Sequence, residues 1–215
     1  MSPMTPFRPW LLGLSLCALA GCSVLASGSK DPVTIYAPNV RVPADPAWPQ
    51  VGWQLAIAKP SAARLVDSPR INVRPTPGEL EVYRGVSWAQ PSTDMFEDTL
   101  LRAFEDSGRI AGVARLGTGI RSDYKLAVDL RRFESDYAGQ AIPSATIEFN
   151  AKLLHTVDQR IAASRTFLVA EPAASTDTAA VAMAFEAALR KATHDLVGWT
   201  LDAGQRDARA HPARQ

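Results

Sequence analysis

One cysteine, Cys22, has neighbours whose types and spacing point to a specific chemistry. It follows Leu19-Ala20-Gly21, and an apolar run from Trp10 to Ala20 precedes it behind the positive charge of Arg8. This is the layout of a secretory signal, in which small residues mark the cleavage site. The apolar run is far shorter than the roughly 20 residues that span a bilayer, so we do not expect it to be a transmembrane helix.

The run Leu19-Ala20-Gly21-Cys22 resembles the bacterial lipobox. The resemblance implies cleavage before Cys22 and attachment of lipid to its thiol and to the new amino terminus. A plain signal peptide is the alternative, but it would remove Cys17 and leave a single free thiol in an oxidising compartment. Ser23, rather than Asp, follows Cys22. By the usual sorting rule for such lipoproteins, this resembles a signal for the outer membrane, with the body in the periplasm. Several acyl chains anchor durably, because each buried methylene contributes about 0.8 kcal/mol.

The histidines do not form a recognisable catalytic pattern. The sequence has no G-x-S-x-G, H-E-x-x-H, glycine-rich phosphate loop or Cys/His metal spacing. His155 falls near the end of an expected strand, where a hydrogen-bonded structural role is the simpler interpretation. His194 lies beside Asp195 with no nucleophile signalled nearby, and His211 lies close to the end of the chain. We therefore expect no enzyme activity, no metal and no cofactor other than the covalent lipid.

Charged residues offer two further sites, each with a plainer alternative. Asp129 and Glu134 could pair as acid and base, but a solvated role fits a strand and its end better. Arg131-Arg132 beside Phe133 is suited to an anionic head group, or is an exposed strand end. Lys and Arg total 23 and Asp and Glu total 22, and Arg8 is the only charge before Cys22. The body would thus carry no net charge, which argues against nucleic-acid binding.

Four aromatic residues are candidates for contacts with a protein partner. Tyr83, Trp88, Phe133 and Tyr137 fall at the ends of expected strands or in loops. Exposed aromatic side chains often anchor protein interfaces. The alternative for each of them is a position at the covered edge of the core.

Two amphipathic helices are expected. In the first, over 92–106, the residues Phe96, Leu100 and Phe104 recur at helical spacing, Ser92 to Asp94 offer N-caps, and Ser107-Gly108 ends the helix. The second begins near Val181 and ends near Trp199, with an apolar face at the same spacing. Both faces should cover the apolar face of a sheet.

The alternation of apolar and polar residues predicts the strands of that sheet. They are expected at 33–37, 51–57, 70–74, 79–83, 110–116, 124–131, 145–157 and 161–169. The last three are long and joined by two loops, which favours an antiparallel meander. The expected fold class is α+β: an antiparallel β-sheet with a three-strand meander, packed by two main amphipathic helices.

The chain divides into four expected segments. Residues 1–21 form the lipoprotein signal peptide and 22–30 an acylated tether. Residues 31–201 form one folded domain, in keeping with the hydrophobic content of 47%. Residues 202–215 lack periodicity and are expected to be a disordered tail.

Several short runs together resemble one family. They are Ser68-Pro69-Arg70-Ile71-Asn72-Val73-Arg74, Tyr83-Arg84-Gly85-Val86-Ser87-Trp88-Ala89-Gln90-Pro91, Glu105-Asp106-Ser107-Gly108, Tyr124-Lys125-Leu126, Arg132-Phe133-Glu134, Ala163-Ser164-Arg165-Thr166-Phe167 and Ala184-Phe185-Glu186-Ala187-Ala188-Leu189. In this order, after a lipobox, the set resembles the ABC-type transport auxiliary lipoprotein family (PqiC/YmbA-like) over roughly residues 31–200. The resemblance rests on order and spacing, because no single run is specific.

The resemblance implies an accessory subunit of an envelope lipid-transport system with an ABC transporter and MCE-domain proteins. The body would be tethered at the outer membrane by Cys22 and would dock the tip of the MCE tunnel, and a homo-oligomer is left open. One rival is a structural lipoprotein that supports an outer-membrane assembly machine. Another is a lipid-anchored hydrolase, which lacks a nucleophile motif. Direct lipid binding by the body is a variant that an apolar cavity as wide as an acyl chain would favour.

Overall fold

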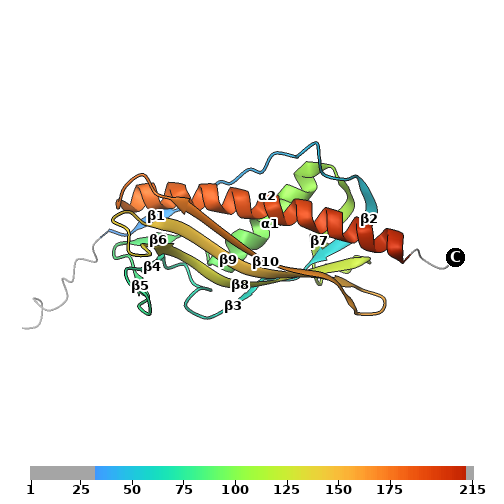
Figure 1. Cartoon of the computed structure of the whole chain (residues 1–215), viewed down its shortest axis with the longest axis horizontal. Coiled ribbons are helices and arrows are strands. Elements are labelled where there is room, and N and C mark those ends of the chain that lie inside the picture. Colours follow the sequence, from blue (N-terminus) through green and yellow to red (C-terminus); the bar gives the residue numbers. More distant parts are fainter. Residues whose placement is uncertain (1–31, 212–215) are drawn as a thin grey trace, which may run out of the picture. The chain divides into compact units, whose positions relative to one another are not determined.

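A computed structural model describes residues 32–211 of the chain, and from Val33 these residues belong to one unit (Figure 1). The predicted signal peptide, Cys22 and the tether lie outside the described residues, as do residues 212–215. The strands are β1 (Thr34–Tyr36), β2 (Val51–Ile57), β3 (Ser61–Ala62), β4 (Asn72–Arg74), β5 (Glu81–Val82), β6 (Val86–Trp88), β7 (Ile110–Arg115), β8 (Tyr124–Asp136), β9 (Ser144–His155) and β10 (Ile161–Pro172). The helices are α1 (Ser92–Ser107) and α2 (Thr178–Ala210).

The main sheet is mixed. Its strand order is β10-β9-β8-β2-β7, and β9 runs antiparallel to both β8 and β10. In contrast, β2, β3 and β4 pair with β8 in parallel, and β2 pairs with β7 in parallel. The α+β class is confirmed. β8, β9 and β10 pair antiparallel, but the sheet as a whole is mixed and not antiparallel throughout as expected. Short hairpins impose antiparallel pairing on the last three strands, whereas β2 reaches β7 through a long crossover that contains α1 and permits parallel pairing.

A second, two-stranded sheet brings together segments far apart in the sequence. β1 pairs in parallel with β6, with Thr34 opposite Val86 and Tyr36 opposite Trp88. The amide of Thr34 also donates to the carbonyl of Gly85 at 2.9 Å. β1 is therefore fixed against the body from its first residue.

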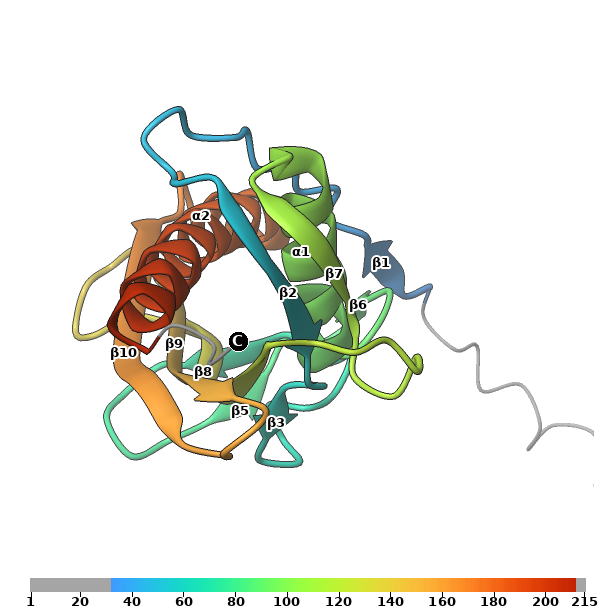
Figure 2. The same ribbon diagram turned by 90° about the vertical axis from the view of Figure 1, so that its right-hand side faces the viewer.

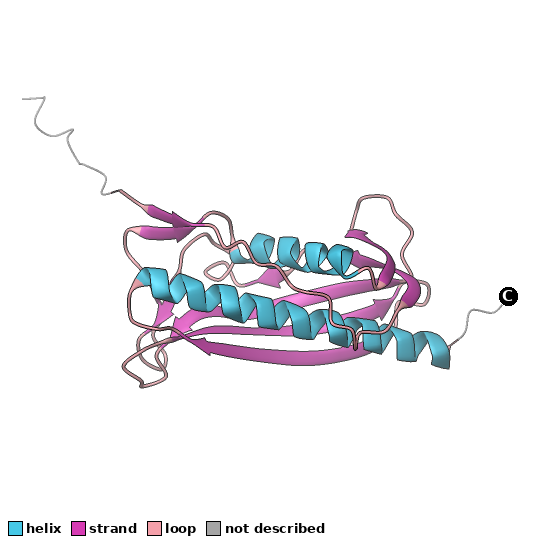
Figure 3. Ribbon diagram, turned by 90° about the horizontal axis from the view of Figure 1, so that it is seen from above, coloured by secondary structure: helices cyan, strands magenta, loops and turns pink. Residues whose placement is uncertain are grey.

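Both helices lie on the same side of the curled main sheet, as expected (Figures 2 and 3). α2 packs on β9 and β10, and α1 packs on β7 and on α2. The core between the helices and the sheet contains aromatic rings. The ring centroid of Phe149 lies 4.9 Å from that of Phe167, in a stacked arrangement, and 5.0 Å from that of Phe96. In the part of the chain that the structure describes, neither helix combines the length and apolarity of a membrane crossing.

The start of α1 differs from the expected capping. Pro91 occupies the N-cap, and the hydroxyls predicted to cap the helix bond elsewhere. Ser92 donates to the carbonyl of Val66 at 2.6 Å, and Thr93 donates to the carboxylate of Asp67. These side chains fasten the helix to the preceding loop. The predicted end is confirmed, because Gly108 takes the left-handed conformation with φ of 60° that favours glycine.

The prediction of a disordered tail from residue 202 is wrong for 202–210, which form the last turns of α2. Leu201, Gly204 and Asp207 are buried on one side of these turns. Gly204 lies directly against the ring of Trp53, a residue of β2 that is 7% exposed. Tertiary contacts from β2 thus extend a helix that the sequence pattern alone ends near Trp199.

We expect Gly204→Ala to destabilise the protein. A Cβ atom at this position would lie 2.4 Å from Cζ2 of Trp53. Overpacking of this kind costs about 1–3 kcal/mol, whereas Gly→Ala at an exposed helix position gains about 1 kcal/mol. The free energy of unfolding, measured in urea, shows whether the substitution destabilises or stabilises the protein. Asp202→Ala, on the exposed side of the same turns, is the control, and a Gly204→Ala protein more stable than the wild type would contradict this packing.

Candidate functional site

The four aromatic residues singled out in the sequence gather at one end of the fold. Trp88 ends β6, Tyr83 follows β5, Phe133 lies in the second half of β8, and Tyr137 follows β8. Figure 1 shows β1, β4, β5 and β6 together at this end. Cys22, the candidate lipidation site, precedes β1 in the chain and lies outside the described residues.

Trp88 and Phe133 are core residues, not surface contacts. Each is only 2% exposed. Phe133 stacks on Phe185 of α2 at 4.8 Å, and Trp88 meets the same ring edge-on at 5.1 Å. Tyr36 of β1 packs against Trp88 at 6.3 Å. The prediction that Trp88 and Phe133 present their rings to a partner is corrected, because β1, β6 and α2 cover them.

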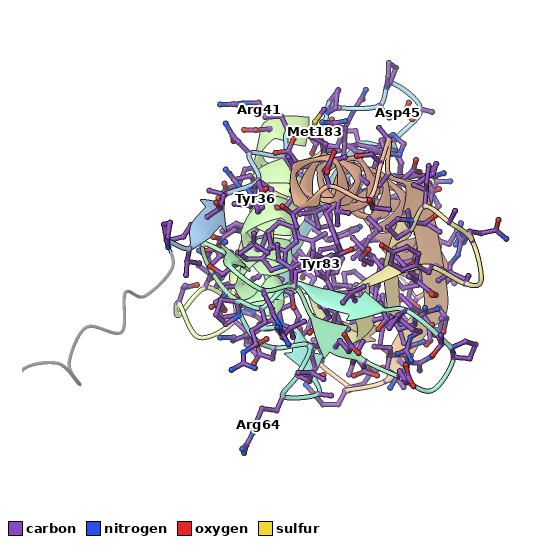
Figure 4. All side chains as sticks on the ribbon, turned by 90° about the vertical axis from the view of Figure 1, so that its left-hand side faces the viewer. Tyr36, Arg41, Asp45, Arg64, Tyr83 and Met183 are labelled. Carbon is purple, nitrogen blue, oxygen red and sulfur yellow. The ribbon has the colours of Figure 1, made fainter. Side chains whose placement is uncertain are left out.

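Tyr83 and Tyr137 are half-buried and keep part of their surface in solvent. The hydroxyl groups of Tyr83 and Ser135 share a hydrogen bond of 3.1 Å. Burial raises the pKa of Tyr83, so its hydroxyl stays protonated at physiological pH. The amide of Tyr137 donates to the carbonyl of Arg74 at 3.1 Å. Tyr83 is labelled in Figure 4, which looks at this end of the fold. A partner contact at these two residues stays a prediction.

An ion-pair network fixes the backbone beneath the two tyrosines. The carboxylate of Glu134, 2% exposed, accepts from both Nε and Nη2 of Arg74 at 2.8 and 3.1 Å. Arg132 donates to the same carboxylate at 2.7 Å and also to Asp136. The hydrogen bond to Glu134 raises the pKa of Arg74. We call Arg74, Arg132, Glu134 and Asp136 the polar corner.

The contacts of the polar corner favour a structural role for the charged residues of β8 over head-group binding or acid–base chemistry. Arg132 is paired within the chain, and Arg131 lies 3.4 Å from Asp129 and 3.8 Å from Glu148. An anionic head group would have to compete with these carboxylates. Glu134 is held by two guanidinium groups, so it acts here as a structural acceptor rather than as the partner of Asp129 in acid–base chemistry.

The histidines have structural partners in the described residues. His155 Nδ1 lies 2.8 Å from Asp158, and its ring packs against Tyr124 at 5.5 Å. This confirms the hydrogen-bonded strand-end role. His194 packs on Trp48 with ring centres 5.0 Å apart. Within residues 32–211 no group of His, Cys, Asp and Glu side chains is arranged to hold a metal ion.

A second ionic cluster, missed in the sequence, ties the end of α2 to the sheet. Arg160 donates to both carboxylate oxygens of Asp207 at 2.6 and 2.7 Å, and the hydroxyl of Tyr124 donates to Asp207 at 2.8 Å. The three residues come from β8, from the loop before β10 and from α2. No pattern in the sequence indicates this contact, because its members lie 36 to 83 positions apart and the lack of periodicity predicts that Asp207 belongs to a tail.

We expect this cluster to stabilise the protein less in acid than at neutral pH. The hydrogen bond from Arg160 holds the pKa of Asp207 below its ordinary value of 3.8, with a further hydrogen bond from Tyr124 acting the same way. A lowered folded-state pKa contributes stability above the ordinary value, and this contribution is lost as pH falls through the folded-state pKa.

Asp207→Asn should lower the free energy of unfolding at pH 7 by about 1–3 kcal/mol, the cost of poorly satisfied buried groups. Between neutral pH and pH 3, the free energy of unfolding of this variant should fall by less than that of the wild type. Urea unfolding at the two pH values measures this. Asp202→Asn, at an exposed position on the last turns of α2, is the control. Identical acid sensitivity in Asp207→Asn and the wild type would contradict the assignment.

Two surface hollows adjoin α2. One, of about 440 Å³, lies beside α2 and is lined by Ala47, Trp48, Arg165, His194, Asp195, Gly198, Trp199, Asp202 and Arg206. The other, of about 290 Å³, lies between β1 and the first turns of α2 and is lined by Ile35, Tyr36, Ala37, Pro38, Ala179, Ala182, Met183 and Glu186. The first is mixed in charge and the second is mostly apolar.

Comparison with known proteins gives one family and two informative solved structures. A sequence model of the family described as "ABC-type transport auxiliary lipoprotein component" matches residues 34–197. A crystal structure of a Xanthomonas campestris protein is 71% identical in sequence and has a TM-score of 0.80, covering 82% of this chain and 99% of its own. A second crystal structure, of an uncharacterised protein, is 12% identical with a TM-score of 0.60 over 77% of this chain and 97% of its own, and shows the fold alone.

A curated relative is longer than this chain. It is an uncharacterised protein of Bradyrhizobium diazoefficiens that is 25% identical over 185 residues, covering 85% of this chain. The match covers 49% of the relative, so the chain spans about half the length of the curated relative it matches.

Proposed function

Because this chain belongs to the ABC-type transport auxiliary lipoprotein family, we propose that it is an accessory subunit of an envelope lipid-transport system. In this proposal Cys22 carries the lipid that anchors the chain in the outer membrane, and the body faces the periplasm. The body docks the tip of a tunnel built by MCE-domain proteins, and another subunit supplies the ATPase. The family match carries the proposal, since it extends from β1 into α2 and thus covers most of the folded unit.

The position of Cys22 supports a role at a membrane surface. The chain from Cys22 to Val33, where the folded unit begins, reaches about 40 Å at most when fully extended. An acylated Cys22 would therefore keep the β1 end of the body near the lipid head groups. Lipid passing between a docked tunnel and the membrane would avoid water, where each exposed methylene costs about 0.8 kcal/mol.

Tyr83 and Tyr137 are the proposed contacts with the MCE-domain partner. The polar corner and the buried ring of Phe133 hold the end of β8 below them. A rigid aromatic contact loses little conformational entropy on binding, which favours such residues as anchors of an interface. Their position near the β1 end would bring the partner close to the membrane.

Site-specific crosslinking in cells tests the docking. A photoreactive residue at Tyr137 should capture an MCE-domain protein, whereas the same residue at Leu168, 63% exposed on β10, should capture none. Capture of an outer-membrane barrel protein at Tyr137 would instead support the structural lipoprotein of an assembly machine. Capture of the MCE-domain protein at Leu168 alone would place the contact on another face.

A further inference from the structure

β1 presents apolar side chains to solvent beside a covered aromatic ring. Side chains alternate along a strand, and Tyr36 points inward, where its hydroxyl shares a 3.0 Å hydrogen bond with the hydroxyl of Thr178. The alternate positions Val33 and Ile35 are 57% and 64% exposed. β1 pairs only with β6 among the described strands, so these side chains stand at a free edge.

The first turns of α2 extend this apolar area. Met183 is 72% exposed, and Ala179 lies one turn before it on the same side of the helix. Ile35 and Met183 line the same 290 Å³ hollow, and Glu186 is the one charged residue among the described residues that line it. Figure 4 shows Tyr36 and Met183 at this end of the fold. We call Val33, Ile35, Ala179 and Met183 the β1–α2 surface.

Along the chain, the β1–α2 surface begins with the first exposed large apolar residues of the described part after the proposed anchor. Val33 is its first residue and is joined to Cys22 by the short segment described above. Of the other exposed apolar residues, Ile142 lies in the loop between β8 and β9, and Val157 and Ile161 lie at the hairpin between β9 and β10. That hairpin is at the opposite end of β9, a strand of 12 residues that spans about 40 Å.

We propose that the β1–α2 surface rests on the lipid surface of the membrane that holds Cys22. This inference depends on the lipid anchor of the proposed function. Apolar side chains close to a membrane bury themselves at the boundary of head groups and acyl chains. Arg84 is exposed and precedes Gly85, whose carbonyl accepts from the amide of Thr34, so the chain next to β1 carries a positive charge that anionic head groups would attract. With this contact the anchor and the body form two points of attachment, which orient the body instead of leaving it free to rotate.

The test measures how close single positions lie to lipid. The full chain, acylated and purified from membranes, carries Ile35→Cys or Met183→Cys with an environment-sensitive fluorophore on the new thiol. Controls are Leu168→Cys and Val157→Cys, at positions 63% and 79% exposed, and the unsubstituted chain measures background labelling. All are reconstituted into vesicles of phosphatidylethanolamine and phosphatidylglycerol with a fraction of lipid that carries a spin label on its acyl chain.

We expect the fluorophores at positions 35 and 183 to shift to the blue and to lose most of their emission to the spin-labelled lipid, while those at 168 and 157 stay unquenched. Unchanged urea unfolding confirms that each variant is folded. A blue shift without quenching at 35 and 183 would indicate a protein occupant, such as a second copy of the chain, and would overturn the proposal. Equal quenching at all four positions would also overturn it.

Flotation of the vesicles separates this inference from the proposed function. Protein that floats with the vesicles but shows no quenching at 35 and 183 retains its anchor and contradicts the membrane contact alone. Protein that does not float contradicts the lipid anchor and, with it, the membrane contact.

Discussion

Phe133→Ala should lower the free energy of unfolding by about 3–5 kcal/mol, as for other buried phenylalanines. The ring is 2% exposed and stacks on Phe185 with an interplanar angle of 24°. It also meets Trp88 edge-on at 6.1 Å. Its removal opens a cavity between β8, β6 and α2 that the surrounding rings cannot fill without leaving their rotamers. Chemical denaturation followed by tryptophan fluorescence measures the loss.

The control for this prediction is Tyr83→Phe. It removes only the hydroxyl that bonds to Ser135, at a net cost of about 0.5–1.5 kcal/mol. If Phe133 were instead a surface contact with a partner, Phe133→Ala would leave unfolding unchanged and would weaken only the complex. Wild-type stability of Phe133→Ala would therefore contradict the core position of this ring.

Cys22→Ser should release the chain completely from the membrane. The oxygen of serine replaces the sulfur that would carry lipid, so the chain would lose anchoring worth about 0.8 kcal/mol per buried methylene. The fraction of protein in membrane pellets after a high-salt wash measures the effect. Cys17→Ser, within the apolar run, is the matched control and should stay anchored. Cys22→Ser protein that remains in the washed pellet would show that another feature holds the chain.

The sequence pattern predicts a helix or strand correctly where one side of that element is buried along its whole length. Leu126, Val128 and Leu130 alternate along β8 and are all 3% exposed or less. α1 was predicted from the spacing of Phe96 and Phe104, both fully buried. In these elements local periodicity and tertiary burial agree, so the sequence specifies them on its own.

The pattern does not predict the length of a helix or the burial of a side chain where residues distant in the sequence determine them. The last turns of α2 are polar in sequence and are held by Trp53 and by Arg160. Trp88 lies at a strand end, which suggested a surface position, but β1 covers it through a parallel pairing that no local signal indicates. Spacing along the chain identified the aromatic residues at this end of the fold and did not show which of them are covered.

The most direct test of the proposed function is to identify what co-purifies with the full chain. Envelopes carrying wild-type protein or Cys22→Ser are solubilised gently, and the proteins captured with each are identified by mass spectrometry. The proposal predicts an outer-membrane wild type that brings down an MCE-domain protein of an ABC transporter, and a Cys22→Ser protein absent from the membrane fraction. A membrane-bound wild type that captures only a barrel protein, or no partner, would contradict the transport role and leave the lipid anchor intact.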